Sequence, residues 1–212
     1  MRLLLAIPSG DFMPVQFVKS LTGLERKLDR DGVNYEECIV DGTLVYMARD
    51  KLASKAVNDG FSHVLWLDSD MVFSPNLLED LMMCKKSFVS CCYNGRRPGY
   101  HSCIFKSIDL IKGVERFEEY PREPFRIAAC GFGAVFMETE ILKAVMLNFK
   151  TAFTPETNLG EDIAFCKRAR DLGFEIWAEP NCQLGHVGHL VLYPQDHDKW
   201  KQEMLEAVNG RA

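Results

Sequence analysis

Along the first 83 residues, short apolar runs are followed in turn by segments with helical spacing, a pattern that predicts alternating strands and helices. Three short apolar runs predict the strands: 2–7, 37–40 and 64–67. Elsewhere apolar residues recur every three or four positions, which predicts amphipathic helices at Phe17 to Leu28 and Leu44 to Ala56. A third helix, Pro75 to Met83, is predicted from its start signals. This alternation is typical of an open α/β sheet that carries helices on its faces.

Two of these helices have candidate N-caps. Thr43 precedes the second helix, and its hydroxyl could accept a hydrogen bond from a free backbone N–H of the first turn. Ser74 precedes Pro75, a residue that suits the first helical position. We therefore expect both helices to begin at these residues.

The second half of the chain is less regular and adds antiparallel strands to the pattern. Strands are predicted at 88–93, 99–105, 125–129, 133–137 and 174–178, with helices at 139–146, 161–171 and from about Asp196. No internal repeat or linker divides the sequence. We therefore expect one α/β domain over 1–212, with a doubly wound, mostly parallel central sheet and added antiparallel strands.

Composition and charge narrow the class of protein. Apolar residues make up 47% of the 212 positions and charged residues 26%, the balance of a globular protein. No segment approaches the ~18 uninterrupted apolar residues that span a bilayer, so we expect no membrane span and a cytoplasmic protein. The eight cysteines contain no C-x-x-C pair, and we expect them to stay reduced. A net charge of −5 argues against bulk binding to nucleic acid.

Two aspartates directly follow the third predicted strand. Asp68 and Asp70 lie at i and i+2, so on an extended segment their carboxylates point to one side. They also lie beyond the carboxyl edge of the sheet, where α/β folds bind ligands. Two carboxylates there can hold Mg²⁺ or Mn²⁺ together with phosphate oxygens. The alternative is a turn with two solvated aspartates.

The segment from Arg49 to Asp70 resembles the Asp-x-Asp region of GT-A glycosyltransferases, metal-dependent enzymes built on a Rossmann-like sheet. Three later motifs extend the resemblance in the family's order: Gly131 to Phe136, Gly160-Glu161-Asp162, and Gly185-His186. Four motifs over most of the chain are more specific than any one of them.

The resemblance implies a metal site and a nucleotide site. Asp70, helped by Asp68, would bind Mn²⁺ or Mg²⁺ on the donor's diphosphate, with His186 as a third protein ligand. His189, three residues further on, is the alternative ligand. The residues expected to bind the donor are Pro8, Ser9, Arg49, Asp68, Ser69, Gly131 and Gly133.

Glu161 and Asp162 are the candidate catalytic residues. Acidic residues in a first helical turn offset the positive end of the helix, which is the alternative explanation for both. Asp162, however, shares a helical face with Phe165 and Ala169, so its carboxylate should point inward. A carboxylate that faces a cleft can take a proton from an attacking hydroxyl, whereas Glu161 is expected at the helix cap or the edge of the acceptor.

Alternatives remain for the other candidate residues. Gly131 and Gly133 could let the backbone approach a bound sugar, or could mark a bulge or tight packing. Arg49 could position the donor or lie on a solvated helix face. The basic stretch from Tyr93 to Tyr100 could clamp a diphosphate or an acceptor, or could be a plain loop, and 148–160 could form a lid.

These observations predict a glycosyltransferase that moves a sugar from a nucleotide-sugar, by resemblance a UDP-sugar, to an unidentified acceptor. Residues 1–92 would bind the nucleotide and 93–212 would build the acceptor and catalytic side. A nucleotidyltransferase is the rival enzyme, but the loop from Pro8 to Phe12 has one glycine and no basic residue. A non-catalytic nucleotide-sugar-binding protein is the other rival, and the retained acidic residues disfavour it.

Overall fold

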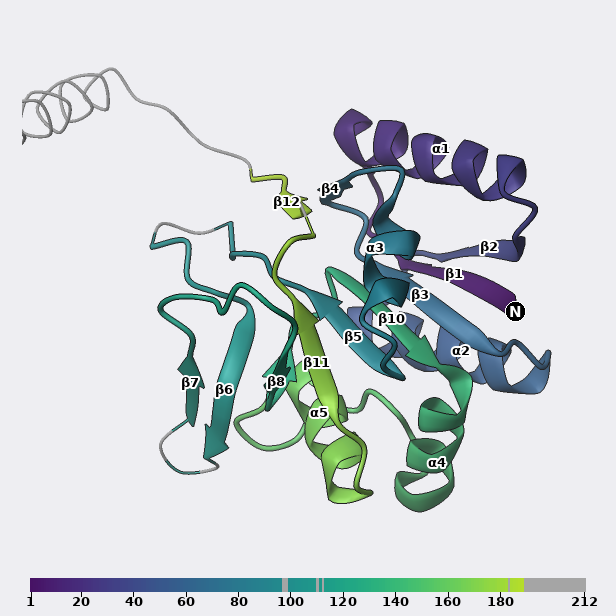
Figure 1. Cartoon of the computed structure of the whole chain (residues 1–212). Helices are drawn as coiled ribbons and strands as arrows, with labels where there is room; N and C mark the ends of the chain where they lie inside the picture. The colour runs from purple at the N-terminus through teal and green to yellow at the C-terminus, as the bar shows by residue number, and fades with distance from the viewer. Residues whose placement is uncertain (97–98, 110, 112, 183, 189–212) are drawn as a thin grey trace, which may run out of the picture.

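The structure, a computed structural model, describes residues 1–96, 99–109, 111, 113–182 and 184–188. A seven-stranded sheet forms its centre (Figure 1). The strand order is β2 (Asn34–Val40), β1 (Arg2–Pro8), β3 (His63–Leu67), β10 (Ala134–Glu138), β5 (Phe88–Cys91), β11 (Ile176–Glu179) and β8 (Phe125–Ile127). All neighbours of β10, and the β8–β11 pair, are antiparallel, while the other pairs are parallel. The predicted mostly parallel sheet with added antiparallel strands is confirmed.

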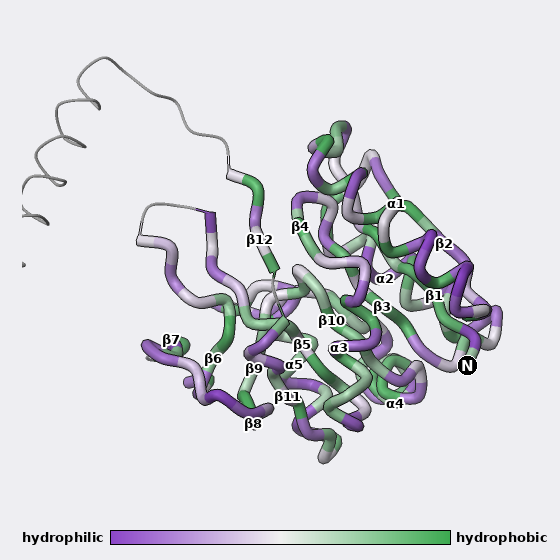
Figure 2. Tube along the Cα trace, turned by 45° about the horizontal axis from the view of Figure 1, so that its top comes forward, coloured by the Kyte–Doolittle hydropathy of each residue, from purple (hydrophilic) through white to green (hydrophobic). Residues whose placement is uncertain are grey.

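Helices cover both faces of this sheet. One face packs against α1 (Val15–Arg30) and α3 (Leu77–Met83). The opposite face packs against α2 (Val45–Asn58), α4 (Thr139–Phe149) and α5 (Glu161–Asp171). Along the inner strands β3 and β10 the trace in Figure 2 is largely green, the colour of apolar residues. The sheet is therefore doubly wound, as the alternating sequence pattern predicts.

The alternation of side chains along each strand divides the apolar residues between two cores. Leu3 and Leu5 of β1 lie in the core beneath α1, whereas Leu4 lies in the core beneath α2. Trp66 belongs to the α2 side, where it packs edge-on against Phe153 with ring centroids 5.1 Å apart. Each of these side chains is fully buried.

Two smaller sheets lie beside the central one. The first pairs β4 (Met71–Phe73) with β12 (Leu184–His186), and the second joins β7 (Gly113–Arg116), β6 (Ile104–Asp109) and β9 (Ala129–Cys130). None of β4, β7 and β12 is predicted from the sequence, because none contains a run of four apolar residues or a clear alternation of apolar and polar residues. The strand predicted at 99–105 lies instead at β6, and the one predicted at 125–129 is divided between β8 and β9.

The predicted helices form, but two predicted caps are wrong. Helix α2 begins at Val45 without a side-chain cap, and the Thr43 hydroxyl lies 3.5 Å from the sulfur of Met47. Helix α3 begins at Leu77, because Ser74 instead accepts a turn hydrogen bond from the backbone N–H of Asn76. The helix predicted from Asp196 lies outside the described residues. No helix in the described ranges combines the length and apolarity needed to cross a membrane.

We expect Leu24→Ala to lower the free energy of unfolding by about 2–5 kcal/mol, because this fully buried side chain of α1 fills the core beneath the sheet. Val18→Ala, at a position 46% exposed on the same helix, is the matched control and should change it by less than about 0.5 kcal/mol. Urea unfolding of both variants provides the measurement. Equal losses would mean that α1 does not pack as described.

Candidate active site

The carboxyl ends of β1 and β3 meet at one edge of the central sheet, because the two strands are parallel neighbours. A cavity of about 390 Å³ lies at this edge. Its lining includes Pro8 and Ser9 from the end of β1, Asp68, Ser69 and Asp70 from the end of β3, and His186 from β12. The structure therefore brings together most residues predicted for the donor and the metal.

The turn after β3 directs its two aspartates to different partners. The backbone N–H of Asp68 donates a hydrogen bond of 3.1 Å to the carbonyl of Gly133, the residue that precedes β10. The Asp68 carboxylate contacts Arg49 at 2.7 Å. The Asp70 carboxylate instead contacts His186, at 3.3 Å, and Arg96. The two acids thus serve separate sides of the site.

Arg49 is buried and bridges two carboxylates. Only 3% of its side chain is exposed, and its two terminal nitrogens lie 2.7 Å from Asp68 and 2.5 Å from Glu161. Burial opposes the charge of Arg49, but the neighbouring Asp68 and Glu161 outweigh it and raise the pKa of the guanidinium. A solvated helix face is therefore excluded for Arg49. Direct contact with a donor stays a prediction, since the guanidinium is already engaged by these acids.

His186 is held with one ring nitrogen toward Asp70. Its Nδ1 lies 3.1 Å from the backbone carbonyl oxygen of Asn94, which can only accept, so Nδ1 carries a hydrogen. Nε2 lies 3.3 Å from Asp70 Oδ2. Burial alone would raise the pKa of Asp70, but the hydrogen bond to His186 and the charge of Arg96 outweigh it and lower the pKa. Contact with Asp70 in turn raises the pKa of His186.

Some of the side chains at this edge are arranged as ligands of a divalent cation would be. A histidine whose other nitrogen donates to a backbone carbonyl is oriented as metal-bound histidines are, and a carboxylate oxygen lies beside it. Within the described ranges, no three His, Cys, Asp or Glu side chains are grouped closely enough to hold an ion. Asp70 and His186 are brought together, whereas Asp68 faces Arg49. The alternative ligand His189 lies outside the described residues.

The Asp162 carboxylate points inward, as its helical position predicts. Its Oδ1 accepts a hydrogen bond of 2.7 Å from the backbone N–H of Ile163 at the start of α5. Burial raises its pKa to about 6, against the opposing charge of Arg49, and the nearby Glu161 adds to the rise. A carboxyl group with this pKa is mostly ionised at neutral pH and can still accept and release a proton.

Gly131 and Gly133 make room for Tyr93. A Cβ at Gly131 would lie 2.2 Å from the Tyr93 hydroxyl, and one at Gly133 would lie 2.8 Å from the Tyr93 ring. The Tyr93 hydroxyl also accepts a hydrogen bond of 3.1 Å from the Gly133 backbone N–H. Tight packing therefore accounts for both glycines, and their approach to a sugar stays a prediction. The sequence does not reveal this role of Tyr93, because its partners lie about 40 residues away.

The segment 148–160, predicted as a lid, is anchored at its centre. One Asp50 carboxylate oxygen accepts hydrogen bonds from the backbone N–H groups of Ala152 and Phe153, at 2.9 and 2.8 Å. Phe153 is fully buried and stacks on Phe165 of α5 with ring centroids 4.5 Å apart. The middle of this segment therefore forms part of the core.

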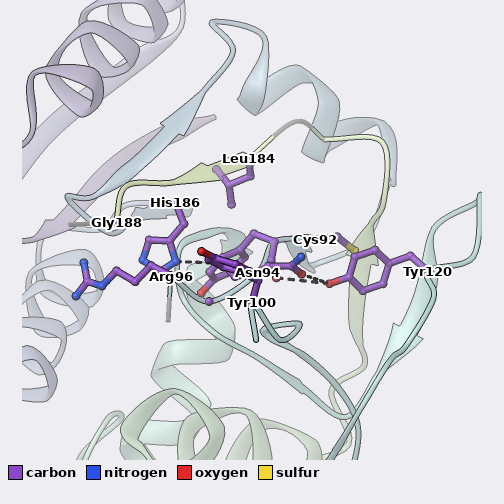
Figure 3. Close-up of a pocket in the computed structure, with 10 residues that line it drawn as sticks. Cys92, Asn94, Arg96, Tyr100, Tyr120, Leu184, His186 and Gly188 are labelled. Atoms are coloured by element: carbon purple, nitrogen blue, oxygen red, sulfur yellow. Dashed lines mark hydrogen bonds between the residues drawn. The ribbon is translucent and has the colours of Figure 1, made fainter. Parts of the chain in front are cut away.

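A second cavity, of about 540 Å³, adjoins the first. Arg96 and His186 line both cavities. Figure 3 shows His186 and Tyr120 on opposite sides of Asn94, with the Arg96 side chain pointing away from Tyr120. Of the predicted stretch from Tyr93 to Tyr100, the residues Tyr93 to Arg96 and Tyr100 therefore contribute to a cavity wall, while residues 97 and 98 lie outside the described residues.

Comparisons with known proteins place the fold. No protein-family model matches the chain, and no curated protein matches it in sequence. Solved structures do match. The chain has the GT-A fold. A197 from STIV is 17% identical with a TM-score of 0.57, over 88% of this chain and 86% of that one.

Two glycosyltransferases share this fold with the chain. GalNAc-T7, solved with UDP, GalNAc and Mn²⁺, is 14% identical with a TM-score of 0.57 over 90% of this chain, and the match spans 44% of its own length. The catalytic domain of Drosophila β1,4-galactosyltransferase 7, in complex with xylobiose, is 13% identical with a TM-score of 0.54, over 92% and 78%. At these identities the likeness concerns the fold alone.

We expect Arg49→Met to lower the free energy of unfolding by about 3 kcal/mol at pH 7, because it leaves Asp68 and Glu161 without their counter-charge. The loss should be smaller at pH 5. Burial already raises the pKa of Asp68, and the loss of the opposing charge of Arg49 raises it further, so protonation removes more of the repulsion as the pH falls. Urea unfolding at both pH values measures this.

Lys51→Met, at an exposed position of the same helix, is the control and should be nearly neutral. A loss in Arg49→Met that is no larger than in this control would contradict the buried bridge.

Proposed function

We propose that this chain is a metal-dependent glycosyltransferase that moves a sugar from a nucleotide-sugar, of the UDP class, to an acceptor hydroxyl. The observation that carries the proposal is the pairing of Asp70 with an oriented His186 beside the cavity at the carboxyl ends of β1 and β3. A protein of the same fold solved with UDP, GalNAc and Mn²⁺ supports the choice of donor and metal.

In this proposal Asp70 and His186 hold Mn²⁺ or Mg²⁺. The cation supplies positive charge against the departing nucleoside diphosphate. Residues 1–92 bind the nucleotide, with Pro8, Ser9 and Ser69 along the cavity. Asp68 is kept in place by Arg49 and is available to the ribose side of the donor rather than to the cation. Residues 93–212 build the acceptor side within the same single domain.

Asp162 is the proposed general base of an inverting reaction. The acceptor oxygen forms a bond to the anomeric carbon, and the bond from that carbon to the diphosphate oxygen breaks with its electron pair leaving on the diphosphate. The acceptor proton passes to Asp162. Glu161 contacts Arg49 at 2.5 Å, so its proposed part is to fix the start of α5 and the edge of the acceptor site.

We expect the affinity for UDP to depend on a divalent cation and on intact Asp70 and His186. Calorimetry with UDP and Mn²⁺ should show an affinity at least tenfold weaker after chelation, and also in Asp70→Ala and His186→Ala. Loss of a residue that only orients a metal ligand lowers metal affinity by about 10–100-fold, and loss of the ligand itself should lower it by no less. His189→Ala is the matched control and should bind as the wild type does. The reverse result for the two histidines would overturn the assignment of His186.

Transfer should fall by roughly 10²-fold or more in Asp162→Asn, with UDP affinity and melting temperature nearly unchanged. The amide keeps the shape of the side chain but cannot take a proton. Asp171→Asn, an exposed position of the same helix, controls for surface charge on α5. Turnover in Asp162→Asn close to that of the control would remove Asp162 from the catalytic residues.

Wild-type transfer should also rise with pH around a midpoint near 6. Asp162 accepts a proton only when ionised, and its raised pKa of about 6 leaves it protonated below that pH. Single-turnover rates between pH 5 and 8, with donor saturating at each pH, provide the profile. A rate that is flat across pH 5–7 would contradict the general-base role.

A further inference from the structure

We infer that the second cavity holds the acceptor and that the acceptor is a neutral saccharide, bound with one sugar ring against Tyr100 and its hydroxyls on Asn94 and Tyr120. The inference rests on the proposed function, which it deepens by naming the class of acceptor.

The position of the second cavity gives a ligand in it access to the donor. It shares His186 and Arg96 with the cavity at the ends of β1 and β3. Its wall also includes Tyr93, whose hydroxyl lies against Gly131, and the Asp162 carboxylate lies beside the same glycine. A molecule that fills this cavity therefore has His186, a proposed metal ligand, in its lining. Asp162, the proposed base, does not line the cavity itself but lies close to the Tyr93 hydroxyl, beside Gly131.

The charges of the lining favour a neutral ligand. Among the described residues that line the cavity there is no Lys, Asp or Glu, and only Arg96 and His186 can carry positive charge. Both of these already contact the Asp70 carboxylate. Among the described lining residues a basic peptide would find no carboxylate, and an acidic acceptor would find only the guanidinium and imidazole that already face Asp70.

Hydrogen-bonding groups lie at the middle of the cavity, on Asn94, and at the end opposite His186, on Tyr120. The Tyr120 hydroxyl donates to the Ser102 hydroxyl at 2.7 Å and keeps lone pairs for a further donor. It also lies 3.4 Å from the side-chain carbonyl of Asn94, which is exposed (Figure 3). Hydroxyl and amide groups of this kind bind sugar hydroxyls, and a lipid chain would instead need a long apolar wall.

The backbone presents Tyr100 outward in a conformation that costs energy. Its φ is +39°, a value that bulky residues rarely adopt, and 56% of its side chain is exposed at the rim of the cavity. A strained and exposed aromatic residue at a cavity is an observation that points to a ligand. The C–H face of a sugar ring can pack on such a ring while its hydroxyls reach Asn94 and Tyr120.

The test measures binding of neutral disaccharides to the protein with UDP and Mn²⁺ present. Saturation-transfer NMR and calorimetry would use cellobiose, maltose, lactose and N,N′-diacetylchitobiose as methyl glycosides. We expect at least one to bind, with an affinity about tenfold lower in Tyr100→Ala and retained in Tyr100→Phe, because the ring rather than the hydroxyl makes the contact. UDP affinity should stay unchanged in both variants.

Two further variants separate the contact from general effects. Tyr100→Gly should lose saccharide binding as Tyr100→Ala does, yet should not melt earlier than the wild type, because glycine accepts a positive φ. Leu147→Ala, at a position 78% exposed on α4, is the matched surface control and should bind normally. A saccharide that binds equally well to Tyr100→Ala and to wild type would overturn the assignment.

Other outcomes also decide the matter. If UDP and Mn²⁺ bind but no saccharide does, the acceptor inference fails and the proposed function stands. If a single-stranded oligonucleotide or a polyprenyl phosphate binds in a manner that depends on Tyr100, the acceptor is of that other class and the inference is wrong. If UDP does not bind at all, the proposed function itself fails.

Discussion

The arrangement of the site depends on one buried charge, the guanidinium of Arg49. It lies between the turn after β3 and the first turn of α5, where three carboxylates act on its charge: Asp68, Glu161 and Asp162. Without a cation in this position, Asp68, Glu161 and Asp162 would repel one another in surroundings that screen charge poorly. Arg49 thus allows acidic groups from distant parts of the chain to be held close together. It also separates Asp68 from Asp70 and leaves Asp70 to His186.

Much of the fold could be predicted because the longer helices and the central strands have clear patterns of apolar residues. The apolar run from Val64 to Leu67 in β3 and the spacing of three or four residues between apolar positions along α1 are each clear enough to identify the element. Helix α5 is also predicted with its observed bounds, since Gly160 and two acidic residues begin it. The short strands β4 and β12 could not be predicted, because their stability comes from pairing with each other rather than from local propensity.

The candidate residues of the site could be predicted, but their partners could not. Asp70 and His186 meet as the resemblance implies, and Asp162 points inward as its helical phase predicts. The contacts of Asp68 and of the two glycines near Tyr93 depend on segments far apart in the sequence. Helical periodicity left Arg49 open between solvent and site, because periodicity does not reveal which buried positions have carboxylates opposite them.

The pairing of β4 with β12 has a consequence for the order in which the protein folds. The two strands close a loop that spans most of the chain, and the contact between Asp70 and His186 joins residues 116 positions apart. Contacts of such sequence separation carry a large closure entropy and tend to form late in folding. Synthesis from the N-terminus would therefore yield a sheet with the ends of β1 and β3 already in place before the histidine arrives. The proposed metal site would therefore be the last part of this fold to form.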